Sequence, residues 1–285
     1  VLRRGLGDRS PPVKAACLEM LRKVWLEDES DGLVTEFLSS LDVEKNPAVA
    51  EECIKELVDC GHLRLTDIID STSKLGGLRN AAKESSSDSP AFLSSEKALY
   101  WRVICQKLSR EAATRSDTAA NAGGGSAVES VAAAAAGERL DALEDILPTD
   151  AGELLSLIKI HAIGREHAFA GEQLLSLVSC MDMADATCRR GAEALVQQLI
   201  RTTTDEELYS DSFVRAIVSS ARHVYATANE LAEAILGAVE ELREEWQLVI
   251  SEGTSETETL RWERCLRLLY LYFEGIPVGS NPAPS

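Results

Sequence analysis

Apolar residues recur at spacings of three and four along most of the chain, which is the spacing of one face of an α-helix. The first clear stripe follows Ser10 and Pro11, two residue types that are common at a helix start. The same arrangement recurs after Asn46 and Pro47. The side chains expected to pack are Val13, Cys17, Met20, Leu21 and Trp25 in the first helix, and Val49, Cys53, Ile54, Leu57 and Val58 in the second.

Similar spacing predicts helices in the rest of the chain. The expected ranges are 31–41, 93–110, 151–164, 167–180, 185–201, 205–222, 228–250 and 257–273. Runs of alternating β-branched residues, which would indicate strands, are scarce. The pattern therefore predicts an all-α fold.

The first two helices also resemble each other, because Val49 and Cys53 follow Val13 and Cys17 at an offset of 36 residues. This offset is close to the period of about 40 residues that is typical of HEAT and armadillo repeats. Short amphipathic helices cannot bury their apolar faces alone, so neighbouring helices must stack. We expect a HEAT-type right-handed α-solenoid.

Two stretches interrupt the helical pattern with small, polar residues that bury too little area to offset their ordering entropy. They divide the chain into six expected parts. These are HEAT-like helices over 1–70, a flexible loop over 71–91, one solenoid helix over 92–112, a low-complexity linker over 113–137, HEAT-like helices over 138–275, and a disordered tail over 276–285.

The distribution of charge along the chain bears on whether the protein binds DNA. Of the 285 residues, 45% are hydrophobic and 5% aromatic, so aliphatic side chains must provide most of the core. Residues 111–285 carry 13 basic and 29 acidic side chains, a net charge of −16. An acidic surface repels the phosphates of DNA. Any contact with nucleic acid must therefore come from local patches or from parts of the protein outside this sequence.

The cysteines indicate an environment that keeps thiols reduced. There are seven, an odd number, and they are scattered along the chain. The sequence has no signal-peptide pattern and no apolar run of about 18 residues, so we expect an intracellular protein with no membrane contact. It begins with Val1, and we expect it to be a segment of a longer chain.

No pattern of catalytic or metal-binding residues stands out. The four histidines lie in no Ser/His/Asp or HExxH arrangement. Cys53, Cys60 and His62 lack the fourth ligand and the spacing of a structural zinc site. The run 123–126 (GGGS) has no Lys-Ser/Thr after it, so a linker is expected rather than a phosphate-binding loop. We expect a protein that is not an enzyme, with no metal and no cofactor.

Four residues are candidates for binding a partner protein. Arg189 and Arg190 either lie in solvent, paired with a carboxylate, or hold an acidic segment or a phosphate through their guanidinium groups. Tyr100 and Trp101 are adjacent on one helix and point about 100° apart. We therefore expect one of these two aromatic side chains in the core and the other at the rim of a groove.

Two Ser-Pro dipeptides, at Ser10 and Ser89, are possible targets of proline-directed kinases. The alternative, that both dipeptides are only turn and helix-start signals, stays open at this stage. If they are used, Ser89 is expected to be modified first, because it lies in the polar 71–91 stretch. Ser10 is expected to cap a helix, which would engage its hydroxyl group.

Five segments, in order along the chain, resemble one protein family, the HEAT-repeat non-SMC condensin subunits of the CAP-G type. The segments are 4–14 (RGLGDRSPPVK) with Trp25-Leu26, 38–49 (LSSLDVEKNPAV), 98–105 (ALYWRVIC), 143–148 (LEDILP) and 173–190 (QLLSLVSCMDMADATCRR). Two departures are Cys188, where the family pattern has glycine, and the Ser- and Ala-rich stretches, which are similar to lineage-specific insertions.

The resemblance implies a non-catalytic scaffold subunit of condensin. Members of this family bind the kleisin subunit of the CAP-H type, contact the SMC ATPase heads indirectly, and support DNA binding during mitotic chromosome condensation. The expected location is the nucleus and mitotic chromosomes, with a cytoplasmic pool. Two other classes remain open at this stage: another HEAT or armadillo adaptor, such as a transport receptor or phosphatase scaffold, and a hydrolase with an unrecognised site.

Overall fold

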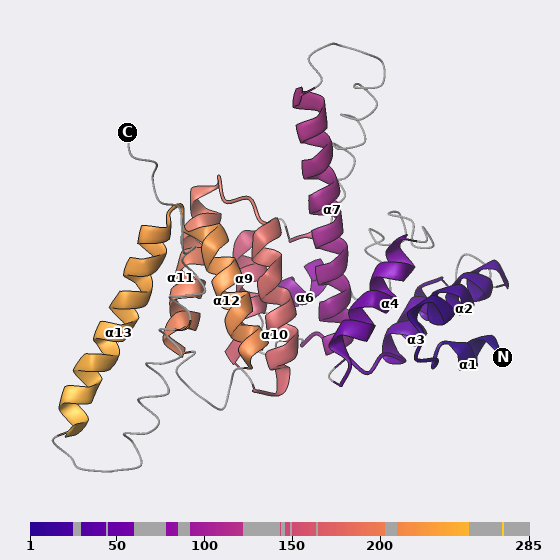
Figure 1. The fold of residues 1–285 in the computed structure, drawn as a ribbon, viewed down its shortest axis with the longest axis horizontal. Coiled ribbons are helices and arrows are strands. Elements are labelled where there is room, and N and C mark those ends of the chain that lie inside the picture. The colour runs from indigo at the N-terminus through magenta and orange to yellow at the C-terminus, as the bar shows by residue number, and fades with distance from the viewer. Residues whose placement is uncertain are drawn as a thin grey trace. The chain divides into compact units, whose positions relative to one another are not determined.

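The fold is helical in every part of the chain that the computed structural model describes. These parts are residues 1–24, 30–43, 45–59, 78–84, 92–121, 143, 146–148, 150–163, 165–202, 210–250 and 270. They contain no strand, which confirms the all-α class (Figure 1). The chain divides into two compact units, Val1–Leu157 (unit 1) and Ile158–Ser285 (unit 2). The division falls within one helix, α9.

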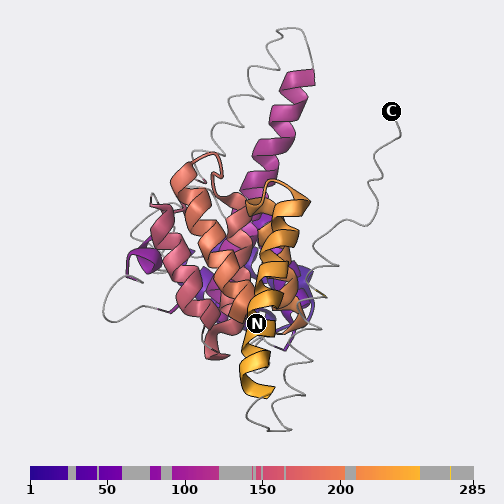
Figure 2. The same ribbon diagram turned by 90° about the vertical axis from the view of Figure 1, so that its left-hand side faces the viewer.

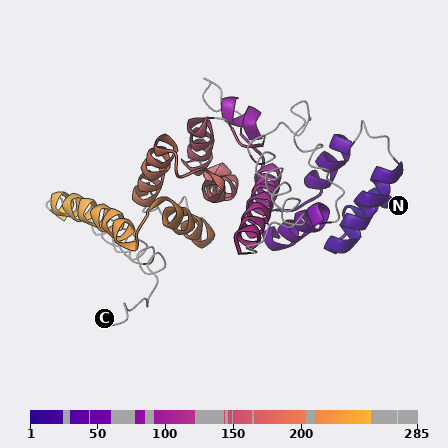
Figure 3. The same ribbon diagram turned by 90° about the horizontal axis from the view of Figure 1, so that it is seen from above.

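Unit 1 is a series of helices that contact their neighbours. Its helices are α1 (Leu2–Gly5), α2 (Pro11–Val24), α3 (Ser30–Ser39), α4 (Pro47–Asp59), α6 (Leu78–Glu84), α7 (Ser95–Asn121) and the first half of α9 (Ala151–Ile163). The helix α2 packs against α1, α3 and α4, and α4 also packs against α7 (Figure 3). The two helices that resemble each other in sequence, α2 and α4, therefore lie side by side.

The packed face of α2 differs from the expected one. Val13 is 41% exposed and Met20 is 55% exposed, although both were expected to pack. Leu21 is buried as expected, and three side chains that were not expected to pack, Lys14, Ala15 and Leu18, are buried as well. The reason lies in the neighbours of α2. The four-residue helix α1 packs against α2, and its Gly5 lies so close to the Cys17 sulfur that a Cβ at Gly5 would clash with it.

Two helices extend into ranges that were expected to be loop or linker. The helix α6 lies inside 71–91, and its Leu78 and Ala82 are fully buried. The helix α7 continues to Asn121, past residue 112 and into the expected linker. Although residues 71–91 are mostly polar, Leu78 and Ala82 are four residues apart and form one short apolar face that α6 buries. The other boundaries of the six-part division remain predictions.

Unit 2 is built around α12 (Asp211–Val224). This helix packs against α10 (Ala168–Leu175), the 3₁₀ turn η3 (Ser176–Cys180), α11 (Ala186–Thr202) and α13 (Ala228–Ile250) (Figure 2). Its side chains Phe213, Ile217 and Ala221 are at most 1% exposed. The second half of α9 and the turn η2 (Arg165–His167) complete the described helical elements of this unit.

The helix boundaries in unit 2 differ in part from the expected ranges. The range 167–180, expected as one helix, is α10 followed by the 3₁₀ turn η3. The helix α12 begins after Ser210, whose side-chain oxygen accepts a hydrogen bond from the Phe213 N–H at 3.3 Å. Ser210 is therefore the N-cap of this helix.

Within the described residues, no helix is both long and apolar enough to cross a membrane.

Candidate protein-binding surface

The aromatic pair expected at a groove rim lies in the core of unit 1. Tyr100 is 0% exposed and Trp101 is 2% exposed, and their ring centroids lie 5.3 Å apart in an edge-to-face arrangement. The expectation that one of them faces a groove is wrong. The helix α7 contacts both α3 and α4, so side chains that diverge by about 100° can both be covered. These two aromatic residues support the fold and offer no free surface.

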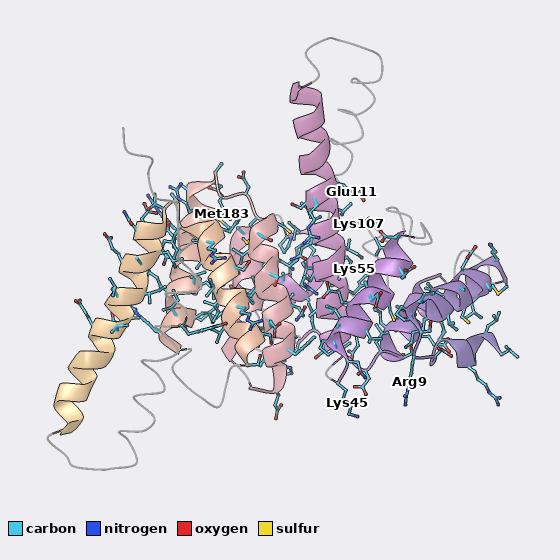
Figure 4. All side chains as sticks on the ribbon, viewed as in Figure 1. Arg9, Lys45, Lys55, Lys107, Glu111 and Met183 are labelled. Carbon is cyan, nitrogen blue, oxygen red and sulfur yellow. The ribbon has the colours of Figure 1, made fainter. Side chains whose placement is uncertain are left out.

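A network of charged side chains joins α4 to α7 beside this aromatic pair. Glu51 of α4 pairs with Arg102 of α7 at 2.5 Å and with Lys55 at 2.6 Å. Lys107 of α7 pairs with Asp59 of α4, and Figure 4 shows Lys55 and Lys107 at this contact. Partial burial alone would raise the pKa of Glu51. The hydrogen bonds and charges of Lys55 and Arg102 outweigh burial and lower that pKa below its ordinary value.

The arginine pair of α11 lies in solvent. Arg189 and Arg190 are both exposed, and Arg189 Nε lies 3.9 Å from Oε1 of Glu193, one turn further along the helix. This distance is at the limit of an ion pair, and pairs exposed in this way contribute little to stability. Arg189 thus fits the simpler interpretation of a solvated face. The role of the pair in binding a partner remains a prediction.

Of the two Ser-Pro dipeptides, only the one at Ser10 lies among the described residues. Ser89 lies outside the described residues. Ser10 precedes α2 as expected, but in the described part of the chain its hydroxyl group makes no hydrogen bond. The next two residues are prolines, which have no N–H group, so fewer donors at this helix start need a cap. The Ser10 N–H donates to Asp8 Oδ1 at 2.9 Å, and its carbonyl accepts from the Lys14 N–H at 3.1 Å.

Two cations of unit 1, one buried and one half-buried, bind backbone carbonyl groups, and no sequence pattern predicts such contacts. Lys14 is only 6% exposed, and its Nζ donates to the carbonyl oxygen of Ser40, just after α3, at 3.4 Å. Arg79 Nε and Nη2 donate to the Leu147 carbonyl oxygen at 3.2 and 3.1 Å. Helix C-termini carry partial negative charge, so Lys14 caps the end of α3. Arg79 holds the segment that precedes α9.

Three of the five cysteines in the described ranges, Cys53, Cys105 and Cys188, are buried as small core residues. Those described are free thiols, and burial raises the pKa of both Cys53 and Cys188. Within the described ranges, no three His, Cys, Asp or Glu side chains gather as a metal site. Cys60 and His62, which were compared with the ligands of a structural zinc site, lie outside those ranges.

One surface pattern was missed at the level of sequence. The residues that lead into α2 and α4 correspond at the same 36-residue offset, because Arg9 matches Lys45 and Val13 matches Val49. Both valines are exposed to the same degree, 41% and 40%. The signal was present in the offset already noted for Val13 and Cys17. Because the apolar stripes of both helices run through these valines, both side chains were expected in the core.

Comparison with known proteins gives relatives over most of the chain. No family model matches it. It is 25% identical over 260 residues to condensin complex subunit 3 of Homo sapiens, covering 85% of this chain and 22% of that protein. It is also 25% identical over 203 residues to condensin complex subunit 3 of Xenopus laevis, covering 70% of this chain and 18% of that protein. This confirms the resemblance to condensin complex subunit 3.

The fold is similar as well. A chain in the crystal structure of the S. pombe condensin Cnd3-Cnd2 subcomplex matches 96% of this chain with a TM-score of 0.58 and 20% sequence identity, covering 30% of that chain. The likeness supports the HEAT-type class. The present chain spans about a fifth of the length of the condensin complex subunit 3 proteins that it matches.

Proposed function

We propose that this chain is part of a non-catalytic condensin subunit that binds a kleisin subunit of the CAP-H type. The observation that carries the proposal is the similarity to condensin complex subunit 3, which extends over 85% of the chain. The fold match adds support, because the neighbour was solved as a Cnd3-Cnd2 subcomplex, in which two named condensin components associate.

A scaffold role fits the way the helices are arranged. Stacked helices present long surfaces on which an extended partner segment can lie. The kleisin would connect this subunit to the SMC ATPase heads, and chromosomal DNA would be contacted through the whole complex. The corresponding location is the nucleus and mitotic chromosomes. The acidic character of residues 111–285 agrees with a segment that binds protein in preference to DNA.

The test is association with the CAP-H type partner. The full-length protein and its partner should co-purify, and the 285-residue chain should bind a kleisin fragment by calorimetry at micromolar concentration. No heat and no co-elution would leave only a spacer role for this chain.

The exposed arginines of α11 provide a sharper version of this test. If they hold an acidic part of the kleisin, the double variant Arg189→Glu/Arg190→Glu should weaken binding by about tenfold or more, because charge reversal at an interface leaves like charges facing each other. Lys159→Glu is a matched control, since Lys159 is an exposed cation of α9. Equal binding by both variants would remove the arginine pair from the interface.

A further inference from the structure

The helix α13 carries an apolar strip beside its buried face. Leu236 is 52% exposed, and Ala232 and Val239, about one turn before and after it, are half-buried. The buried face itself includes Leu231 and Ile235, each 2% exposed. A single exposed leucine is ordinary, but three apolar side chains in line along one helix form a surface that another element can cover.

This strip is turned away from α11. Glu241 pairs with Arg201 of α11 at 2.7 Å. Five residues separate Glu241 from Leu236, which is a rotation of about 140° around the helix. The strip therefore borders the other neighbour of α13, which is α12.

Leu236 lies level with Arg215 of α12. The two helices are joined by three residues, 225–227, and pack against each other as a hairpin (Figure 1). Arg215 is nine residues before the end of α12, and Leu236 is eight residues after the start of α13. At 1.5 Å per residue, both therefore lie about 12–14 Å from the turn of the hairpin.

The chain returns to this level after α13. Tyr270 is helical, and its hydroxyl oxygen accepts a hydrogen bond from Arg215 Nε at 3.3 Å. The sequence neighbours of Tyr270 lie outside the described residues. The contact shows that a residue 20 positions beyond the end of α13 lies against the middle of α12.

The sequence around Tyr270 has the pattern of an amphipathic helix. Four other apolar side chains share its face at spacings of three and four: Trp262, Leu266, Leu269 and Phe273. Three cations lie outside this stripe: Arg261, Arg264 and Arg267. Because Tyr270 contacts α12, the apolar stripe is the side of such a helix that would face α12 and α13.

The lengths also agree. From Leu236 to the end of α13 there are 14 residues, and from residue 257 to Tyr270 there are 13. A helix beginning at residue 257 and running back along α13 would thus bring Tyr270 level with Leu236, about 20 Å from the far end of α13. The six residues between them, 251–256, are within the usual length of a connection between antiparallel helices.

Charge favours the same pairing. The helix α13 carries six acidic residues and one arginine, a net charge of −5. Residues 257–273 carry three arginines and two glutamates, a net charge of +1. Glu233 and Glu240 flank Leu236 and are exposed, so an arginine at the edge of the apolar stripe would meet opposite charge there.

We propose that residues 257–273 form an amphipathic helix that docks on α12 and α13, covers Leu236 and is anchored by Tyr270 on Arg215. The strip on α13 is therefore an internal docking surface for a segment of this same chain. It is not a surface for a second copy or for another protein. This docking does not depend on the proposed function.

Hydrogen exchange followed by mass spectrometry tests the docking on the complete 285-residue chain. The amides of residues 257–273 should exchange at least about tenfold more slowly than in an unstructured peptide. Leu236→Asp should raise their exchange about tenfold, because it places a charge under the apolar stripe. Met20→Asp is the matched control, since Met20 is an exposed apolar residue of unit 1. Unchanged exchange of α12 in the same data shows that unit 2 stays folded.

Paired substitutions within the segment test which face docks. Leu266→Ser should raise the exchange of residues 257–273 about tenfold, whereas Leu268→Ser, on the opposite face, should not. Tyr270→Phe, which removes only the hydroxyl group bound by Arg215, should raise it about threefold. Tyr272→Phe is the matched control for that change, because Tyr272 lies about 160° away from Tyr270.

Several results would overturn the docking. These are exchange of residues 257–273 at the rate of an unstructured peptide, no response to Leu236→Asp, or equal effects of Leu266→Ser and Leu268→Ser. A dimer in light scattering that Leu236→Asp dissociates would assign the strip to a second copy instead. Protection that appears only after the CAP-H type partner is added would assign it to that partner. Protection of the segment in a chain that binds no kleisin would leave the docking intact while the proposed function fails.

Discussion

Gly171 of α10 lies so close to His161 of α9 that a Cβ on Gly171 would be 2.9 Å from the His161 carbonyl oxygen. The backbone N–H of Ala162 would be equally close. The atoms in the way belong to the backbone, so they cannot rotate aside as the end of a side chain can. Only glycine permits this approach of the two helices, and His161 itself is fully buried there.

The first prediction follows from this contact. Gly171→Ala should destabilise the chain by about 1–3 kcal/mol, the usual cost of overpacking. Gly237→Ala is the matched control, because a Cβ at Gly237 in α13 meets no atom within 4 Å. The control should stabilise by about 0.5–1 kcal/mol, since alanine is the better helix former. Urea unfolding measures both, and equal effects of the two substitutions would contradict the packing described.

The second prediction concerns the ion pairs between α4 and α7. Glu51→Gln should destabilise the chain by about 1 kcal/mol at pH 7, because it leaves the Arg102 guanidinium without its carboxylate partner. The pKa of Glu51 is lowered in the folded chain, so its stabilisation is fully present above the ordinary value of 4.5. It is lost as the pH falls through the lower, folded pKa. Unfolding curves of the two proteins should therefore converge in acid.

A cross-helix pair in solvent is the control for this pH dependence. Arg201 of α11 and Glu241 of α13 lie 2.7 Å apart, with side chains 57% and 53% exposed. Glu241→Gln should change stability by less than about 0.5 kcal/mol at any pH. A larger effect for Glu241→Gln than for Glu51→Gln would reverse the ranking that burial suggests.

The third prediction concerns the buried aromatic pair. Trp101→Ala should destabilise the chain by about 3–5 kcal/mol, as expected for removing a large side chain from a core. Leu236→Ala, at a residue that is 52% exposed, should cost less than about 1 kcal/mol. Thermal unfolding gives both values. A Trp101→Ala variant that kept its stability but lost binding to a partner would restore the groove-rim interpretation.

The fourth prediction concerns DNA. Residues 111–285 carry a net charge of −16, so the isolated chain should bind duplex DNA weakly at physiological salt. The residual binding should fall steeply as salt is added, because it depends on the few exposed cations. Fluorescence polarisation at several salt concentrations gives the slope. Tight binding that does not respond to salt would contradict the charge argument.

The fifth prediction concerns phosphorylation. Mass spectrometry of protein from mitotic cells should find Ser89 modified before Ser10. The reason expected from sequence was a capping role of the Ser10 hydroxyl. The structure supplies a different reason, since the Ser10 backbone is held on both sides by Asp8 and by the Lys14 N–H. A kinase that needs an extended segment must first break these bonds. Modification of Ser10 alone would reverse the order.

The sequence was sufficient to predict where α2 and α4 begin, because the signals there are local. Pro11 and Pro47 open α2 and α4, as their fixed backbone angles favour. It was not sufficient to predict which side of a helix is buried, since that depends on the neighbours. On α2 the apolar stripe through Val13 and Met20 competed with the one through Leu18, and the positions of α3 and α4 favoured the second.

The dependence of burial on neighbouring helices also explains why the expectation for Tyr100 and Trp101 was wrong. Two adjacent aromatic residues cannot share one face of a helix, so the sequence suggested that one must be exposed. This reasoning holds for a helix with one covered side and fails for α7, which has neighbours on more than one side. The charged residue Lys14 was missed for a related reason, because its partner is a backbone carbonyl group, which has no signature in sequence.

Lys14 also distinguishes two otherwise equivalent helices. At the 36-residue offset its counterpart in α4 is Ala50, which is also buried, at 2% exposed, and carries no charge. If α2 took the place of α4 in a misassembled or domain-swapped arrangement, the ammonium group would lie in an apolar position without the Ser40 carbonyl oxygen. An unpaired buried charge of this kind is strongly unfavourable. A single cation can thus set the order in which repeated helices assemble.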